Sequence, residues 1–233
     1  MKIAILSFYY NNKNYGGLLQ SFATNTFLNK GNLKIAEMLS YDFIRDNSFQ
    51  IYKRKTFFQK IKGETFSSAL KKILKRTNKY LVKFKKRNFR FDFSNRENAY
   101  QFFENRIPHT INKYTTNGIE KINSDYNAYI VGSDQVWNPY IFRKPFFFTF
   151  ASDKKLKIAY AASMGVSEIS DEVANKIIPL IERFDYVSVR EKSAKDLINR
   201  YTDKEVTVVS DPVLLLNQDD WNEVAVSPIS DKS

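Results

Sequence analysis

The chain has 233 residues, no cysteine and one histidine, with 37 Lys and Arg against 25 Asp and Glu and a formal net charge of +12. Hydrophobic residues make up 43% of it, which is enough for a buried core and excludes a chain that is disordered throughout. Without cysteine, and with His109 as the one imidazole, the composition excludes a disulfide scaffold, a thiolate nucleophile and any site that needs two histidines.

The first forty residues predict a β-α-β unit. Residues 2–8 form a compact apolar run of the kind found in buried parallel strands. After an Asn- and Gly-rich turn, residues 18–31 carry apolar side chains at helical spacing and end at a glycine, and residues 33–41 return as a second apolar strand. The first residues include one Lys and no small-residue cleavage site. They are interpreted as a strand and not as a signal peptide, so we expect a cytoplasmic protein.

A strongly basic segment comes next. Residues 53–90 hold 15 Lys or Arg and one Glu, a net charge of +14, whereas the rest of the chain sums to −2. On a helical projection, apolar side chains from Phe66 to Phe84 share one side and the basic residues the other, which predicts an amphipathic helical insertion with a cationic face. The segment could be a surface helix docked on the domain, or it could bind an anionic membrane surface and place the protein peripherally at the inner face of the membrane. Nucleic-acid binding is disfavoured because no nucleic-acid motif accompanies the charge.

The remaining elements alternate between helix and strand. Strands are predicted near 128–132, 157–162, 186–190 and 206–209, and helices near 94–106, 171–184 and 192–201. Pro179 is expected to kink or end the second of these helices. His109 is interpreted as a loop or surface residue. The alternation predicts an α/β fold in which a parallel sheet is covered by helices on both faces.

Small and polar residues follow four of the predicted strands, at the edge where open α/β sheets bind ligands. The candidates are Tyr15, Gly16 and Gly17, then Gly132, Ser133, Asp134 and Gln135, then Ser163, and finally Arg190 with Glu191. Each Ser or Asp can instead cap the helix that follows it, but four such ends in one sheet favour a shared cleft. The glycine turn is not a dinucleotide G-x-G-x-x-G, and no P-loop is present, so no nucleotide cofactor is indicated.

The sequence YIVGSDQVWNP at residues 129–139 resembles the signature of the polysaccharide pyruvyl transferase family. The opening KIAILSFYYNNKNYGGLLQSFA, and the later blocks KIAYAASMG, FDYVSVREKSAKDLI and VVSDPVLLL, resemble that family in the same order. The resemblance covers most of the chain outside about 45–95. It implies a Rossmann-like domain that is the N-terminal half of a two-domain enzyme similar to the GT-B glycosyltransferases.

The resemblance also implies a reaction and roles for the candidates. Such an enzyme transfers pyruvate from phosphoenolpyruvate to sugar hydroxyls as a ketal in cell-surface polysaccharide biosynthesis, with a sugar or a lipid-linked saccharide as acceptor. No resident cofactor or metal is expected. Arg190 is the candidate for donor binding, and a salt bridge to Glu191 or Asp185 is its alternative role. The remaining strand-end candidates from Tyr15 to Ser163 are assigned to the acceptor, and Gln20 is a weaker one. Trp137 is expected to pack in the core and not against a sugar.

The chain departs from the family at its C-terminal end. Residues 1–220 correspond to the first domain, and residues 221–233 to the start of a second one that would carry the family's His-containing motif. His109 does not match that motif, so the catalytic residues are unknown. We expect this chain alone to be inactive, with a second chain as one possible source of the missing half. The alternative is a non-catalytic sugar-binding or assembly module that retains only the first domain.

Overall fold

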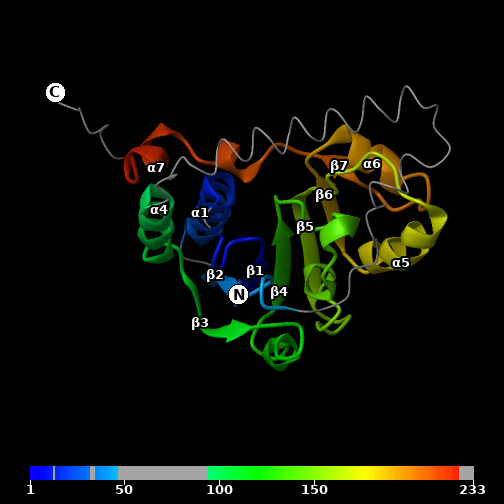
Figure 1. Cartoon of the computed structure of the whole chain (residues 1–233), viewed down its shortest axis with the longest axis horizontal. Coiled ribbons are helices and arrows are strands. Elements are labelled where there is room, and N and C mark those ends of the chain that lie inside the picture. Colours follow the sequence, from blue (N-terminus) through cyan, green and yellow to red (C-terminus); the bar gives the residue numbers. More distant parts are fainter. Residues whose placement is uncertain (13, 32–34, 47–93, 226–233) are drawn as a thin grey trace, which may run out of the picture.

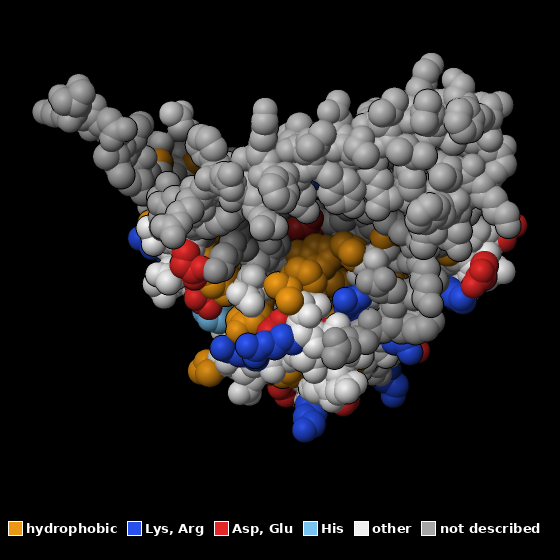
Figure 2. Space-filling view, viewed as in Figure 1, with side chains coloured by type: hydrophobic (Ala, Val, Ile, Leu, Met, Phe, Trp, Pro, Cys, Tyr) orange, Lys and Arg blue, Asp and Glu red, His pale blue; other side chains and the backbone are white. Residues whose placement is uncertain are grey.

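The computed structural model describes residues 1–12, 14–31, 35–46 and 94–225 (Figure 1). The predicted basic insertion at 53–90 therefore lies outside the described residues. Within the described part, no helix combines the length and apolar character needed to span a bilayer. On the face shown in Figure 2, charged side chains of both signs are scattered around the rim and hydrophobic ones gather near the centre.

A seven-stranded sheet forms the centre of the described structure. Its strands are β1 (Lys2–Leu6), β2 (Ile35–Tyr41), β3 (His109–Tyr114), β4 (Ala128–Gly132), β5 (Leu156–Ala162), β6 (Tyr186–Val189) and β7 (Thr207–Val208). Their order is β3-β2-β1-β4-β5-β6-β7, and every neighbouring pair is parallel. β1 is an interior strand because Ile3 pairs with Ala36 on one side and with Ala128 on the other. The predicted parallel α/β sheet is confirmed.

Helices cover both faces of this sheet (Figure 1). They are α1 (Tyr15–Asn29), α4 (Ser94–Glu104), α5 (Asp171–Glu182), α6 (Lys192–Ile198) and the short α7 (Gln218–Asn222), with 3₁₀ turns η1 (Ile119–Ile122), η2 (Pro139–Ile141), η3 (Lys144–Phe147) and η4 (Pro212–Leu215). One hydrophobic cluster joins α1 and α4 to the face of β1 that carries Ile3 and Ile5. The other joins α5 and α6 to the face that carries Ala4 and Leu6. Alternate side chains of a buried strand point to opposite faces, so the same strand contributes to both clusters.

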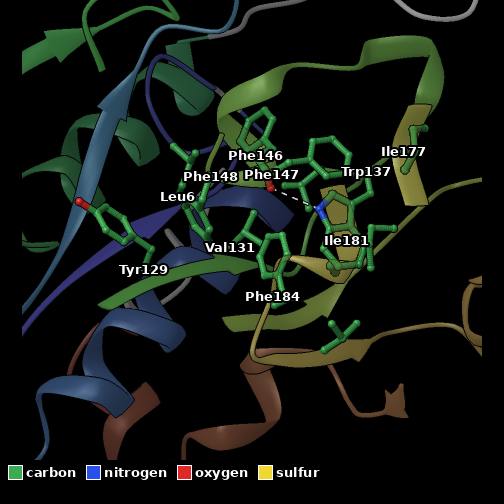
Figure 3. Packing of buried hydrophobic residues seen from close by; sticks show 14 of the residues in the cluster. Leu6, Tyr129, Val131, Trp137, Phe146, Phe147, Phe148, Ile177, Ile181 and Phe184 are labelled. Carbon is green, nitrogen blue, oxygen red and sulfur yellow. Dashed lines mark hydrogen bonds between the residues drawn. The ribbon is translucent and has the colours of Figure 1, made fainter. Parts of the chain in front are cut away.

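Trp137 belongs to the aromatic part of the second cluster, where it lies close to Phe147 and Ile181 (Figure 3). Its side chain is fully buried, and its indole Nε1 donates to the carbonyl of Phe146 at 3.2 Å. The ring stacks on Phe147 with centroids 5.9 Å apart and meets Phe184 edge-on at 5.4 Å. This confirms the expectation that Trp137 packs in the core.

The structure corrects one local prediction and narrows another. No strand was expected at 109–114, yet β3 occupies these residues and pairs with β2 at the sheet edge. His109 is accordingly the first residue of a strand and not part of a loop, and its Nδ1 donates to the carbonyl of Ile107 at 2.8 Å. Helix α5 also continues past Pro179 to Glu182, so the proline does not end it.

Candidate active site

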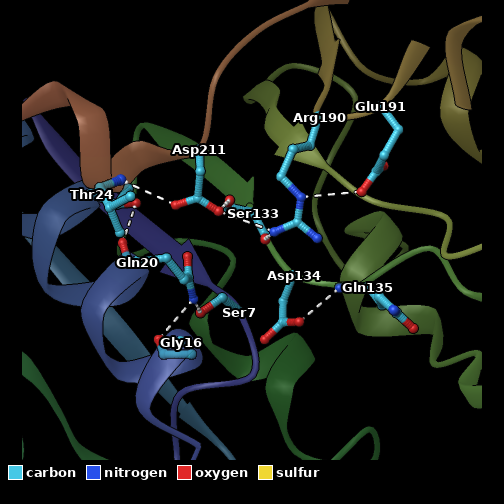
Figure 4. Close-up of polar contacts among 12 residues, drawn as sticks. Ser7, Gly16, Gln20, Thr24, Ser133, Asp134, Gln135, Arg190, Glu191 and Asp211 are labelled. Carbon is cyan, nitrogen blue, oxygen red and sulfur yellow. Dashed lines mark hydrogen bonds and ion pairs between the residues drawn. The ribbon is translucent and has the colours of Figure 1, made fainter.

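The carboxyl ends of all seven strands point to the same edge of the sheet, and the candidates meet there beside the centre (Figure 4). The chain leaves β1 toward β2 on one side and later returns to build β4 on the other side. The gap between the ends of β1 and β4 is therefore a topological switch point, the place where ligands of open α/β sheets bind. Helix α1 begins at this gap.

Gly17 allows the first turn of α1 to lie close to the ends of β1 and β4. A Cβ at Gly17 would lie 3.1 Å from both the Phe8 carbonyl oxygen and Asn12 Nδ2, and 3.5 Å from Asp134 Oδ2. Asn14 caps the helix by accepting a hydrogen bond from the Gly16 amide at 3.1 Å. The turn thus places the amino end of α1 beside the Asp134 carboxylate, and a larger residue at 17 would have to displace its neighbours.

Gln20 is committed to the interior and not to the cleft. Its Nε2 donates to Ser7 Oγ at 2.9 Å, to the Gly17 carbonyl at 3.0 Å and to Ser21 Oγ at 2.8 Å. All these side chains are buried. The network holds α1 against the end of β1, which agrees with the weaker weight given to Gln20 as a binding residue.

Ser133 forms the sharp turn at the end of β4. Its φ of 27° lies in the left-handed region, which a residue with a Cβ adopts at a cost. Its amide donates to the Tyr160 carbonyl at 3.1 Å, and its Oγ donates to Asp211 Oδ2 at 2.9 Å. The adjacent Gly132 has little room for a side chain, because a Cβ there would lie 3.3 Å from the Tyr160 carbonyl oxygen. Both residues are buried, so the structure gives them partners within the protein.

Asp134 presents a half-buried carboxylate at the switch point. Its Oδ1 accepts from the Gln135 amide at 3.0 Å. Burial raises the pKa of this carboxyl above its usual value. The nearby Asp211 charge raises it further, while the Gln135 amide and the Arg190 charge oppose the shift. The group is therefore easier to protonate than an exposed aspartate.

Arg190 projects from the end of β6 and binds two carboxylates. Its Nε donates to Glu191 Oε1 at 3.1 Å, and its Nη1 donates to Asp211 Oδ2 at 3.0 Å and to the Ser133 carbonyl at 2.8 Å. Of the two alternative partners expected, Glu191 is confirmed and Asp185 is wrong, because Asp185 accepts from the Lys157 amide. Glu191 and Asp211 thus pair directly with the guanidinium, and Asp134 lies near enough to interact with its charge.

Gln135 and Ser163 flank Asp134. Gln135 is exposed, and its Oε1 accepts from Asn138 Nδ2 at 2.8 Å. Gly165, with φ of 62°, makes room for it, because a Cβ there would lie 2.6 Å from Gln135 Oε1. Ser163 is buried behind Asp134, where its amide donates to the Asp134 carbonyl at 3.0 Å, and its Oγ has no hydrogen-bond partner among the described residues.

Sequence reasoning missed Asp211 and Ser7. Asp211 precedes Pro212 and caps η4, a pattern that indicates only a turn. Ser7 lies inside the apolar run of the first strand. No local pattern indicates that either residue meets the candidates from the other strands. Within the described ranges, no three His, Asp or Glu side chains lie close enough together to hold a metal ion.

The model of the polysaccharide pyruvyl transferase family matches residues 14–232. The chain belongs to this family. The matched region contains every strand-end candidate from Tyr15 to Arg190, and Asp211 as well. The search of curated proteins and the search of solved structures each found no significant match.

Proposed function

We propose that this protein acts in the transfer of pyruvate from phosphoenolpyruvate to sugar hydroxyls, as a ketal, in cell-surface polysaccharide biosynthesis. Membership of the polysaccharide pyruvyl transferase family supports this reaction class. The observation that carries the proposal is the meeting of the α1 amino end, Asp134 and Arg190 at one switch point. Residues that contribute to one site from three separate strand ends are arranged to hold a ligand between them.

In this proposal Asp134 and Gln135 contact the acceptor. A carboxylate accepts hydrogen bonds from hydroxyl groups, and one whose pKa is raised by burial is better suited to take a proton from the attacking hydroxyl. Tyr15 is exposed at the start of α1 and offers a ring face. The backbone of Gly16 and Gly17 can approach the sugar closely. Gly132, Ser133 and Ser163 are buried, and they support the acceptor site from behind.

Arg190 is proposed to bind the donor. Phosphoenolpyruvate carries a carboxylate and a phosphate, whereas Arg190 already faces Glu191 and Asp211. An ion pair on a partly exposed arginine contributes about 1 kcal/mol or less. A dissociation constant of 0.1 mM requires about 5.5 kcal/mol. We therefore propose that further cations come from a second domain, in a GT-B-like arrangement, supplied by more chain or by a second chain. Residues 1–233 alone should bind phosphoenolpyruvate weakly and transfer no pyruvate.

The acceptor role can be tested directly. Saturation-transfer NMR with a panel of methyl glycosides should detect binding by the purified chain, and Asp134→Asn should abolish it. Asp125→Asn is the matched control, because Asp125 is an exposed aspartate just before the amino end of β4, at the opposite edge of the sheet. Binding that survives Asp134→Asn, or no binding of any glycoside, would contradict the proposed acceptor site.

A non-catalytic sugar-binding or assembly module is the second candidate. The three carboxylates near Arg190 favour it, because carboxylates suit uncharged hydroxyl groups better than a dianionic or trianionic donor. The two functions differ in one measurement. A module binds glycosides, but mass spectrometry detects no pyruvyl ketal when phosphoenolpyruvate and a chain that supplies the proposed second domain are both added.

The basic segment supports a proposal about location. Residues 53–90 lie outside the described structure, but their net charge of +14 is a property of the sequence. We propose that they hold a cytoplasmic protein at the anionic inner face of the membrane, where lipid-linked saccharides are available.

A further inference from the structure

Asp211 joins three parts of the candidate site although it follows the last strand. Its Oδ2 accepts from Ser133 Oγ at 2.9 Å and from Arg190 Nη1 at 3.0 Å. Its Oδ1 accepts from the Val213 amide at 3.1 Å and so caps η4. One carboxylate thus ties the turn after β7 to the ends of β4 and β6 (Figure 4).

Within the part of the chain that the structure describes, the hydrogen bonds around Arg190 leave one end of the guanidinium without a partner. Nε faces Glu191, and Nη1 is held by both Asp211 and the Ser133 carbonyl. Nη2 forms no hydrogen bond with any described residue and is turned away from Asp211 (Figure 4). A guanidinium held along two of its sides can present the third in a fixed direction, and this matters for planar recognition of a carboxylate or phosphate.

The charge of Asp211 and its geometry predict opposite effects on an anion. As a charge, Asp211 repels an anionic ligand of Arg190, so its removal should strengthen anion binding. As a hydrogen-bond acceptor, it fixes the direction of Nη2 and supports the left-handed turn at Ser133, whose carbonyl also holds Nη1. Its removal should then weaken anion binding, because an unrestrained arginine must be ordered each time it binds.

We propose that Asp211 is a positioning residue that orients Arg190 toward the anionic donor. This inference rests on the proposed donor role of Arg190. In this role Asp211 favours anion binding by orienting Arg190, although its own negative charge disfavours it. Removing Asp211 should therefore weaken anion binding, whereas a purely electrostatic role predicts tighter binding. Ser133 has the lesser part, because it contacts Arg190 through its backbone and Asp211 through its hydroxyl.

The test compares Asp211→Asn with a matched control. Asn keeps the size of the side chain and an oxygen that can still accept from Val213. The control is Asp220→Asn, which likewise removes a capping carboxylate and an ion pair, here with Lys30 at the other end of α1. Phosphoenolpyruvate is titrated into the labelled chain by NMR. We expect Asp211→Asn to weaken binding about tenfold, as the loss of a hydrogen bond to a charged group does. Ser133→Ala should weaken binding less, and Asp220→Asn should not change it. Tighter or unchanged binding by Asp211→Asn overturns the proposal.

A second measurement does not depend on donor binding. The exchange of the Arg190 Nε proton with solvent reports how firmly the guanidinium is held, and Arg190→Lys assigns its signal. We expect faster exchange in Asp211→Asn and no change in Asp220→Asn, and equal rates in Asp211→Asn and wild type would refute the positioning role. Because weak binding is expected, the titration extends to a large excess of phosphoenolpyruvate. If the wild-type chain shows no response even there while the exchange result holds, the donor role of Arg190 is wrong and the positioning of its side chain stands.

Discussion

Asp134 lies where burial disfavours its ionised form, so that ionisation lowers the stability of the folded protein. Burial raises its pKa above the ordinary 3.8, so the folded chain holds this proton more tightly than the unfolded chain. The stability linked to this proton is complete below the ordinary pKa and is lost as the pH rises through the folded pKa. At neutral pH the protein therefore carries the full cost of an ionised Asp134, as expected of a site residue selected for chemistry.

Asp134→Asn should stabilise the protein at pH 7 and have little effect near pH 3. Each kcal/mol recovered should raise the melting temperature by about 2–4 °C in a chain of this size. Thermal unfolding of wild type, Asp134→Asn and the exposed Asp125→Asn across a pH series measures this. A variant that is less stable than wild type at pH 7 would show that attraction to Arg190 outweighs the cost of burial.

At the residue scale, the sequence predicted the candidates that directly follow a strand. Asp134 and Arg190 could be found because the ends of parallel strands share an edge. Asp211 could not, because an Asp before Pro212 is explained by a turn alone, and its contact with Ser133 spans 78 residues of sequence. Whether Ser163 and Ser133 face the cleft or the interior also depends on packing that local sequence does not encode.

At the scale of elements, Trp137 links the GSDQVWNP segment to Phe147 of η3 and to Phe184, which follows α5. Replacing this fully buried ring by Ala should destabilise the fold by about 3–5 kcal/mol, because it leaves a cavity and an unpaired carbonyl at Phe146. Trp221→Ala is the control. Trp221 is only half-buried in α7, and its loss should cost about 1–2 kcal/mol. Urea unfolding measures both, and equal losses would contradict the central role of Trp137.

Element prediction worked where strands are buried on both faces and failed at the sheet edge. β1 and β4 are continuous apolar runs, as parallel strands enclosed by helices must be. β3 has mostly exposed or partly exposed residues, including Asn112 and Lys113, and lacks this apolar signal. Its backbone hydrogen bonds to β2, whose pairing includes a register shift, cannot be predicted from the local sequence pattern. Helix α5 tolerated Pro179 because its buried residues, such as Ile177 and Ile181, hold the helix on the sheet.

At the scale of the whole molecule, the alternation of strands and helices predicted a parallel sheet but not the order of its strands. That order depends on which side of β1 each later crossover takes, a choice made by packing on both faces. The second domain, and the chain that would supply it, are proposed on the basis of the family resemblance alone.

The basic segment should give the protein a salt-sensitive affinity for anionic vesicles. Each Lys or Arg near such a surface contributes about 1 kcal/mol, so binding in a co-sedimentation assay should be strong at low salt and be lost near ~0.5 M salt. Replacing Lys71, Lys72, Lys75 and Arg76 by Gln should weaken it. The same change at Lys154, Lys176, Lys192 and Lys195, outside the segment, should not. Binding that survives high salt would indicate insertion of the apolar side. Tighter binding to duplex DNA, or no binding to vesicles, would contradict the membrane proposal.

The position of β1 between β2 and β4 has a consequence for how the chain folds during synthesis. The first strand leaves the ribosome early, but one of its two neighbours, β4, begins only at Ala128. At about 5–20 residues per second, the ribosome takes several seconds to produce that partner. In this interval β1 can pair with β2 alone, and its other edge, with Ile3 and Ile5, is open to pairing with other chains. The nascent protein therefore passes through a period of aggregation risk that ends when β4 is added.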